Sequence, residues 1–190
     1  MLRNNGKLSR TQKITYTSLL IALAASLRLV KYALFGPVQF INFPGIFTVL
    51  GGIFFGPVTG GTVGIASYVI SDIIIGSPGP WTVVNSLMMG AVGFGFGLLF
   101  NGRDKSKISK TGLLIGCYMI MFAFDVVTSW VLLVLIGWDV SYALLIGLLG
   151  LFIPTPASGG WMVAVGPITE FTTASVVAML VQLLAKNRSK

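Results

Sequence analysis

The chain has 190 residues, of which 55% are hydrophobic and 9% are charged, and its formal net charge is +8. Soluble domains carry about 25% charged residues, so this composition excludes both a soluble globular domain and a disordered chain. The absence of histidine and the single cysteine, Cys117, exclude a Ser-His-Asp triad, a Cys-His dyad, a His-ligated or Cys-cluster metal site and an internal disulfide. We therefore predict one all-α integral membrane domain over residues 1–190.

Eleven of the thirteen lysines and arginines gather in three clusters beside apolar segments. On a soluble protein this charge would suggest nucleic acid as a partner, but basic residues next to membrane spans are retained in the cytoplasm. The clusters predict cytoplasmic tails at 1–12 and 186–190 and a cytoplasmic loop at 101–110, with the lipid bilayer and no nucleic acid among the partners. An even number of spans must then separate successive clusters.

The stretch between the first two clusters divides into four apolar helices, because prolines and glycines interrupt it. Pro37 and Pro44 bound an uncharged loop, Gly56-Pro57 marks a turn, and residues 76–80 form a second uncharged loop. The second of the four helices is short for a full span. The helices are expected at about 13–34, 45–55, 58–75 and 81–100.

The stretch between the second and third clusters predicts two spans, at about 111–136 and 160–184. Between them, residues 141–153 are apolar but too few to cross a bilayer, and counting them as a span would place the C-terminal cations outside. We interpret this segment as interfacial or re-entrant on the outer side, ending at Pro154-Thr155-Pro156. The result is six transmembrane helices with both termini cytoplasmic.

Five ionisable side chains fall within these spans. Such a group costs about 2.5–3.5 kcal/mol on insertion scales and is a functional candidate by default. By depth they lie between the outer leaflet and the midplane, as does Asn85. If their helix faces converge with the aromatic residues near the outer ends, they form an outward-facing cavity for a small, flat, polar organic molecule. The five groups are Arg28, Lys31, Asp72, Asp125 and Glu170, and the aromatic residues are Trp81, Trp130, Trp138, Trp161, Tyr68 and Tyr142.

Plainer interpretations remain open for several of these residues. Tryptophans near span ends commonly form an interface belt. Lys31 could extend to the outer headgroups, and Arg28 with Asp72 could form a structural ion pair. On the first helix, Ser18, Ala22 and Ser26 recur every four residues, and such a flat face packs against another helix of the same chain or of a partner protein.

Several motifs resemble those of a known family. They are the basic N-terminus before a helix with small residues at four-residue spacing, the Gly-Pro-rich block 43–64, Ser71-Asp72 followed by Gly76, and the stretch 80–90. Together they are similar to the substrate-binding S components of energy-coupling factor (ECF) transporters. The resemblance implies a six-helix membrane protein that captures a vitamin or related micronutrient from outside and associates with a transmembrane T component and two cytoplasmic ATPases.

The same resemblance implies roles for two segments. Ser18, Ala22 and Ser26 would contact the T component. The loop 36–43 would close over the ligand, with Gln39 and Asn42 as hydrogen-bonding groups.

The leading hypothesis is a substrate-capture subunit in the cell membrane that is not an enzyme and binds no cofactor. The sequence has no Gly-x-x-x-x-Gly-Lys-[Ser/Thr] loop, so partner subunits would use the ATP. Arg28 and Lys31 would pair with anionic or carbonyl groups of the ligand, and Asp72, Asn85 and Glu170 would hydrogen-bond it. The rival is a self-sufficient secondary transporter with Asp125 or Glu170 as proton carrier. A membrane enzyme is least favoured, because the carboxylates form no recognised motif.

Overall fold

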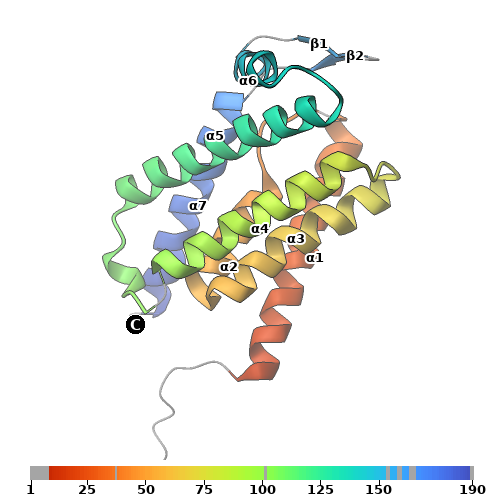
Figure 1. The fold of residues 1–190 in the computed structure, drawn as a ribbon. Helices are drawn as coiled ribbons and strands as arrows, with labels where there is room; N and C mark the ends of the chain where they lie inside the picture. Colours follow the sequence, from red (N-terminus) through yellow and green to blue (C-terminus); the bar gives the residue numbers. More distant parts are fainter. Residues whose placement is uncertain are drawn as a thin grey trace, which may run out of the picture.

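The structure is a computed structural model that describes residues 9–36, 38–100, 102–152, 155–157, 160–162 and 166–188. A 3-10 turn, η1 (Lys105–Lys107), and two three-residue strands, β1 (Thr155–Ala157) and β2 (Gly160–Met162), accompany seven helices in this part of the chain (Figure 1). The helices are α1 (Arg10–Phe35), α2 (Phe43–Phe55), α3 (Pro57–Ile75), α4 (Pro80–Phe100), α5 (Lys110–Leu135), α6 (Val140–Leu149) and α7 (Gly166–Arg188).

Capping and turn residues set the helix ends. Ser9 and Gln12 form a capping box that starts α1: the Gln12 N–H donates to Ser9 Oγ (3.2 Å) and the Ser9 N–H donates to Gln12 Oε1 (2.9 Å). Gly76 ends α3 with a φ of 80°, a left-handed conformation that favours glycine. The predicted ends of the first five helices lie within three residues of those observed, and the capping box explains why α1 begins at Arg10 rather than Lys13.

The predicted start of the last helix, at residue 160, is wrong. Gly160–Met162 forms strand β2, which pairs antiparallel with β1, and α7 begins at Gly166. The physical reason lies in Pro167. A proline is tolerated in the first turn of a helix, whereas in a helix begun at residue 160 it would remove an interior hydrogen bond.

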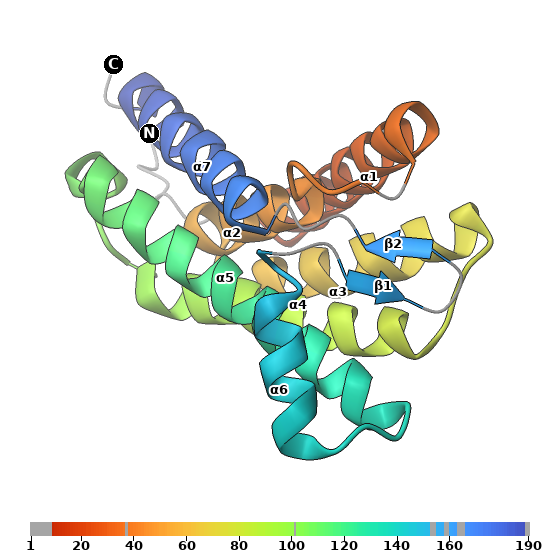
Figure 2. The ribbon, with the colours of Figure 1, turned by 90° about the horizontal axis from the view of Figure 1, so that it is seen from above.

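The apolar segment at 141–153 contains the ten-residue helix α6. Ten helical residues extend about 15 Å, half of the roughly 30 Å hydrocarbon core, so α6 is too short to cross a bilayer. It packs on α5 through its two buried small residues, Ala143 and Gly147. Figure 2 shows α6 beside the C-terminal part of α5, at the edge of the bundle.

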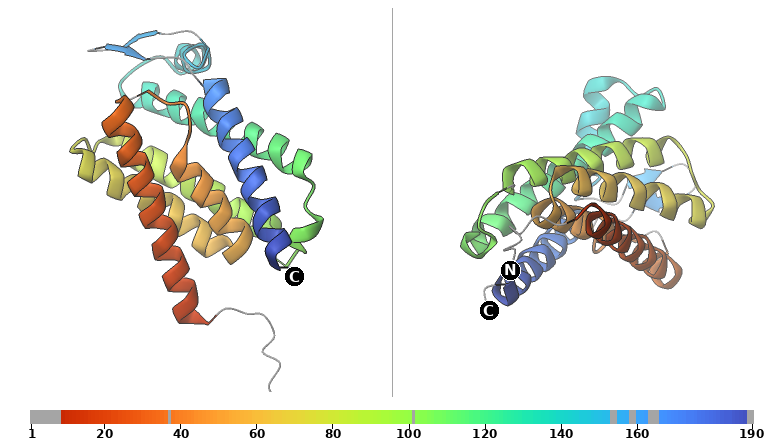
Figure 3. Two further views of the ribbon diagram at one scale, coloured as in Figure 1. Left: turned by 180° about the vertical axis from the view of Figure 1, so that it is seen from behind. Right: turned by 90° about the horizontal axis from the view of Figure 1, so that it is seen from below.

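Helix α2 lies at the centre of the bundle and packs against α1, α3, α4 and α7. It has 13 residues, about 20 Å of helix, and most of them are buried. Figure 3 (left) shows the chain descending between α1 and α7 before α2 begins. Irregular backbone at membrane depth is tolerated only where protein or a cavity surrounds it, and the central position of α2 meets this condition.

Glycines bring the backbones of α2, α3 and α4 into direct contact. A Cβ atom built on Gly60 would lie 2.4 Å from the carbonyl oxygen of Gly93, and one on Gly52 would lie 2.5 Å from the same oxygen. The prediction that glycines let the second and third helices approach closely is therefore confirmed, and α4 joins the same contact through Gly93 and Gly97.

Five of the described helices are long and apolar enough to cross a membrane, namely α1, α3, α4, α5 and α7, while α2 and α6 are shorter. The end of α7 lies beside the loop between α4 and α5, where Gln182 Nε2 donates to the Ile108 carbonyl (2.8 Å). The start of α1 points to the same end of the bundle (Figure 1). The described residues of the three basic clusters thus lie at one end of a multi-pass membrane bundle, while residues 1–8 and 189–190 lie outside the described part of the structure.

Candidate ligand-binding site

A cavity of about 270 Å³ lies toward the opposite end of the bundle from the basic loop. Its volume is close to the lower limit of about 300 Å³ for small-molecule sites. Six of the eight polar residues proposed from the sequence as ligand-binding line it: Arg28, Lys31, Gln39, Asn42, Asn85 and Asp125. The other lining residues include Phe43, Tyr68, Phe124, Thr128, Ser129, Leu132, Leu151 and Thr169.

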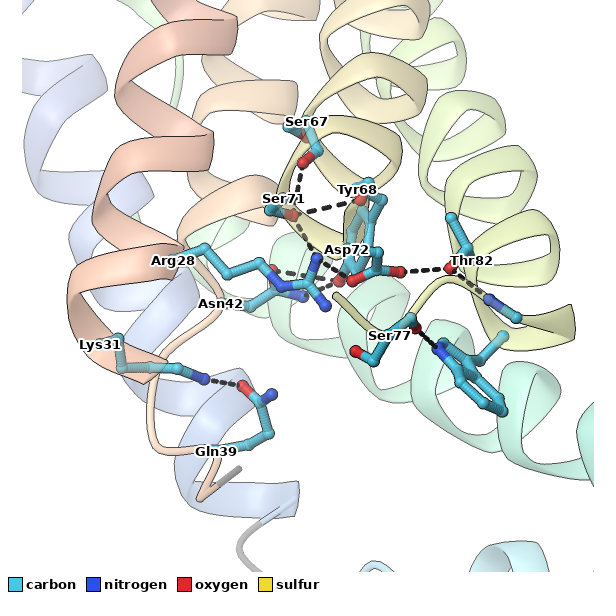
Figure 4. Close-up of polar contacts among 12 residues, drawn as sticks. Arg28, Lys31, Gln39, Asn42, Ser67, Tyr68, Ser71, Asp72, Ser77 and Thr82 are labelled. Carbon is cyan, nitrogen blue, oxygen red and sulfur yellow. Dashed lines mark hydrogen bonds and ion pairs between the residues drawn. The ribbon is translucent and has the colours of Figure 1, made fainter. Parts of the chain in front are cut away.

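Arg28 forms the positive side of the cavity and is fixed by neighbours on α3. Its Nη1 lies 2.6 Å from Asp72 Oδ1 and donates a hydrogen bond to Ser71 Oγ (Figure 4). The guanidinium carbon also lies 4.6 Å from the centroid of the Tyr68 ring. These contacts, on the edge and on the face of the guanidinium, fix its orientation toward the cavity.

Asp72 lies behind Arg28 and outside the cavity. It is 2% exposed, and its second oxygen accepts a hydrogen bond from Thr82 Oγ1 at the start of α4 (2.7 Å). The ion pair considered from the sequence is therefore present, and it joins α1, α3 and α4. In this arrangement Asp72 acts on the cavity through Arg28.

Lys31 and Gln39 occupy the end of the cavity where α1 leads into the connecting loop. The Lys31 ammonium donates to Gln39 Oε1, and the Lys31 side chain is buried (Figure 4). Lys31 thus turns into the protein and does not extend to headgroups.

Threonines of α7 hold the loop before α2. Thr169 Oγ1 donates to the Gln39 carbonyl (2.9 Å), Thr172 Oγ1 donates to the Phe40 carbonyl, and Thr173 Oγ1 accepts from the Asn42 N–H (2.9 Å). These bonds satisfy backbone groups that a loop at membrane depth cannot share with water.

Asn42 is fixed at both ends of its side chain. Its Oδ1 accepts from the Gly45 N–H (2.9 Å) and caps α2, and its Nδ2 donates to the Tyr68 hydroxyl (3.2 Å). The loop and the wall of the cavity are therefore one connected structure.

The negative side of the cavity consists of two carboxyl groups. Asp125 on α5 lines the cavity, and its carboxyl group is in contact with that of Glu170 on α7. Glu170 is 1% exposed and lies behind Asp125 rather than on the cavity surface.

The aromatic wall contains Tyr68, as expected from the sequence, but none of the tryptophans whose side chains the structure describes. Phe43, Tyr68 and Phe124 line the cavity. Trp81 is 45% exposed and lies outside it, with its indole N–H bonded to the Ser77 carbonyl (2.8 Å). The backbone of Trp161 is in β2, and its side chain lies outside the described part of the structure.

The polar stripe on α5 is a feature that the sequence analysis missed. Asp125, Thr128, Ser129 and Leu132 recur at three- and four-residue spacing and line one side of the cavity. Grouping Asp125 with the hydroxyl residues at this spacing would have found the stripe. The threonines of α7 around Glu170 give a similar signal.

The small-residue face of α1 points away from the cavity. Ser18, Ala22 and Ser26 are all exposed, beside the exposed Leu19 and Leu23. Figure 3 shows α1 at the edge of the bundle. The face is not used for packing by the described part of the chain.

Comparison with known proteins identifies the family. A family model described as the S component of ECF-type riboflavin transporters matches residues 8–165, whereas no curated protein and no solved structure matches the chain. The match includes the cavity residues from Arg28 to Leu151. This is a family of transporter subunits and not of enzymes. With five apolar helices of spanning length and most of its length matched, the chain belongs to the family of ECF-type riboflavin transporter S components.

Proposed function

We propose that this chain is the substrate-capture subunit of an ECF-type importer in the cell membrane, and that it binds riboflavin or a closely related vitamin-like molecule in the cavity. The family match over residues 8–165 carries this proposal. The cavity supports it, since its lining offers cationic and amide donors, a carboxylate and three aromatic side chains.

Riboflavin has chemistry that suits these groups. Its flat ring system can lie against Phe43, Tyr68 and Phe124, and its ring carbonyls can accept hydrogen bonds from Arg28 or Lys31. Its hydroxyl groups and imide N–H can donate to Asp125. Each group of the ligand thus has a complementary group in the lining.

The orientation follows from the basic end of the bundle. Lysines and arginines near span ends are retained on the cytoplasmic side. In the proposed topology six segments cross the bilayer, with α2 as the short span, and both termini lie inside. The cavity then opens outward, as capture from the exterior requires.

Transport requires partners in this proposal. A transmembrane T component would dock on the exposed face of Ser18, Ala22 and Ser26, and two cytoplasmic ATPases would use ATP. The chain itself would bind no cofactor.

The first test is a fluorescence titration of riboflavin with the purified protein in detergent. We expect saturable quenching with one molecule per chain, and a loss of about 10- to 100-fold in affinity for Arg28→Ala, equivalent to the roughly 1.5–3 kcal/mol of a hydrogen bond to a charged group. Arg103→Ala, in the loop at the far end, is the matched control. Absence of riboflavin binding would contradict the ligand, and unchanged affinity in both Arg28→Ala and Asp72→Ala would contradict the site.

The buried carboxyl pair is the observation that favours the rival function, a proton-coupled secondary transporter. Reconstitution of the chain alone in vesicles distinguishes the two functions. The capture subunit should bind riboflavin without accumulating it. Uptake driven by a proton gradient in the absence of ATP and partners would establish the rival.

A further inference from the structure

The carboxyl group of Glu170 has an unusual environment. It is 1% exposed, and neither of its oxygens accepts a hydrogen bond from a donor group in the described part of the structure. Its contact is with the carboxyl group of Asp125, which faces the cavity. Buried polar groups are almost always hydrogen-bonded, so this contact requires an explanation.

The charged and titratable groups around the cavity do not neutralise the pair. From α1, Arg28 is paired with Asp72 and Lys31 is bonded to Gln39. From α3, Asp72 faces Arg28, and the Tyr68 hydroxyl is bonded to Asn42. Neither Asp125 nor Glu170 forms an ion pair with a described residue.

Two carboxylates cannot hydrogen-bond each other, because neither has a hydrogen to donate. Two adjacent negative charges in a buried site also repel strongly, so such pairs keep one proton between them. A single proton removes both problems, since it supplies the missing donor and reduces the charge of the pair to −1. Glu170 is the deeper member, whereas Asp125 reaches the cavity.

We propose that Asp125 and Glu170 share one proton at neutral pH, so that the pair keeps a single negative charge and Asp125 offers an acceptor to an N–H or O–H group of the ligand. Glu170 is thus a positioning residue that does not touch the ligand. The shared proton is independent of the proposed function, whereas the part played by Asp125 in ligand binding rests on it. The site selects ligands that carry a donor at this end.

Infrared spectroscopy of the ligand-free protein tests the proton directly. At pH 7 the C=O stretching band of a protonated carboxyl group should be present in the native protein and absent from Glu170→Gln, whose amide can donate a hydrogen bond to an ionised Asp125. Asp104→Asn is the matched control. Two hydrogen bonds from Ser106, one from its hydroxyl and one from its backbone N–H, hold the pKa of the exposed Asp104 below its ordinary value, so Asp104 is ionised and contributes no such band. A native protein without the band, or an equal band in Glu170→Gln, would overturn the proposal.

Riboflavin binding tests the positioning role. Glu170→Ala removes the hydrogen-bonding partner of Asp125, whereas Glu170→Gln keeps one, so the alanine variant should bind riboflavin at least tenfold more weakly than the glutamine variant. Equal losses in the two variants would overturn the positioning role. Failure of the native protein to bind riboflavin would contradict the proposed function, while the infrared band would still decide whether the carboxyl pair holds a proton.

Discussion

Arg28 is held more firmly than any other cation that lines the cavity, since its guanidinium contacts a carboxylate, a hydroxyl and an aromatic ring on α3. An arginine fixed in this way loses little conformational freedom when a ligand binds. The entropy cost of binding is therefore small, and the affinity for the ligand is higher than it would be with a mobile arginine. The same contacts make it structurally important, because Asp72 is almost fully buried beside it.

Removing one partner of this ion pair should destabilise the protein. Arg28→Ala leaves a buried, uncompensated carboxylate, and breaking a buried pair in this way costs about 3–5 kcal/mol. The double variant Arg28→Met with Asp72→Leu should lose less, because no charge remains buried. Thermal unfolding in detergent measures both, and a double variant as unstable as the single one would contradict the prediction.

Thr173 should stabilise the loop before α2, because its hydroxyl accepts a hydrogen bond from the loop backbone. Thr173→Val removes the acceptor of the Asn42 N–H, and an unsatisfied buried donor costs about 1–3 kcal/mol. Riboflavin binding should weaken as well, because Asn42 lines the cavity. Thr62→Val is the control, since the exposed Thr62 hydroxyl bonds only to a carbonyl of its own helix among the contacts shown (2.8 Å). Equal effects of the two substitutions would show that the loop does not depend on Thr173.

The charged residues of the cavity and the threonines of α7 differ in how easily they can be recognised from the sequence. Arg28, Lys31 and Asp125 are conspicuous because a charge within an apolar span is costly. Threonines such as Thr169 and Thr173 are tolerated in membrane helices, since the hydroxyl can bond to a carbonyl of its own helix. Their role depends on which backbone lies opposite, and no pattern within α7 contains that information.

At the scale of elements, the contact among α2, α3 and α4 is made of backbone. Since Gly60 and Gly93 meet without side chains between them, these helices lie too close together to admit even one methyl group without moving apart. The three helices therefore form a rigid wall that holds Tyr68 and Asn85 in place.

A methyl group at this contact should be destabilising. Gly60→Ala would place its Cβ atom 2.4 Å from the Gly93 carbonyl oxygen, so the helices must move apart at a cost of about 1–3 kcal/mol or more. Gly95→Ala is the matched control on α4, where the new Cβ atom has no neighbour within 4 Å and the gain in helix propensity is about 1 kcal/mol. Thermal unfolding should show opposite shifts, and a stable Gly60→Ala variant would contradict the contact.

The exposed face of α1 gives a second prediction at this scale. Ala22→Trp should spare riboflavin binding, because Ala22 lies away from the cavity, but should abolish complex formation with a T component and uptake. Ile115→Trp, at an exposed position of α5, controls for a bulky residue in lipid. Copurification and vitamin uptake measure the two effects, and full uptake by Ala22→Trp would exclude the docking face.

Helices that end at prolines, glycines and caps were predictable, as α3 and α4 show. The start of α7 was not predictable from hydrophobicity, because a short apolar run such as the one before Gly166 is compatible with either a strand or a helix. Likewise, the length of 141–153 excluded a span but did not reveal a helix.

At the scale of the whole molecule, the basic clusters at one end and the cavity toward the other define an axis. The positive-inside rule assigns a side of the membrane to each end. Cys117 is fully buried, so we expect the native chain to react little with thiol reagents and to serve as the background for labelling single introduced cysteines.

Two single cysteines test this orientation. Ser141→Cys at the start of α6 should react with a membrane-impermeant thiol reagent in intact cells, and Ser106→Cys in the η1 turn should react only in inverted vesicles. Both positions are exposed in the structure, so each controls for the accessibility of the other. The reverse labelling pattern would show that the topology is inverted and that the cavity faces the cytoplasm.

The threonine contacts of α7 have a consequence for how the molecule could be shortened or recombined. The match to the family model ends at residue 165, so α7, which holds the loop before α2, lies wholly beyond the matched residues. A chimera that joined residues 8–165 to the closing helix of a different S component would inherit most of the lining and lose the brace. The chimera would then bind a vitamin only if the grafted helix carried hydroxyl groups at the positions of Thr169, Thr172 and Thr173.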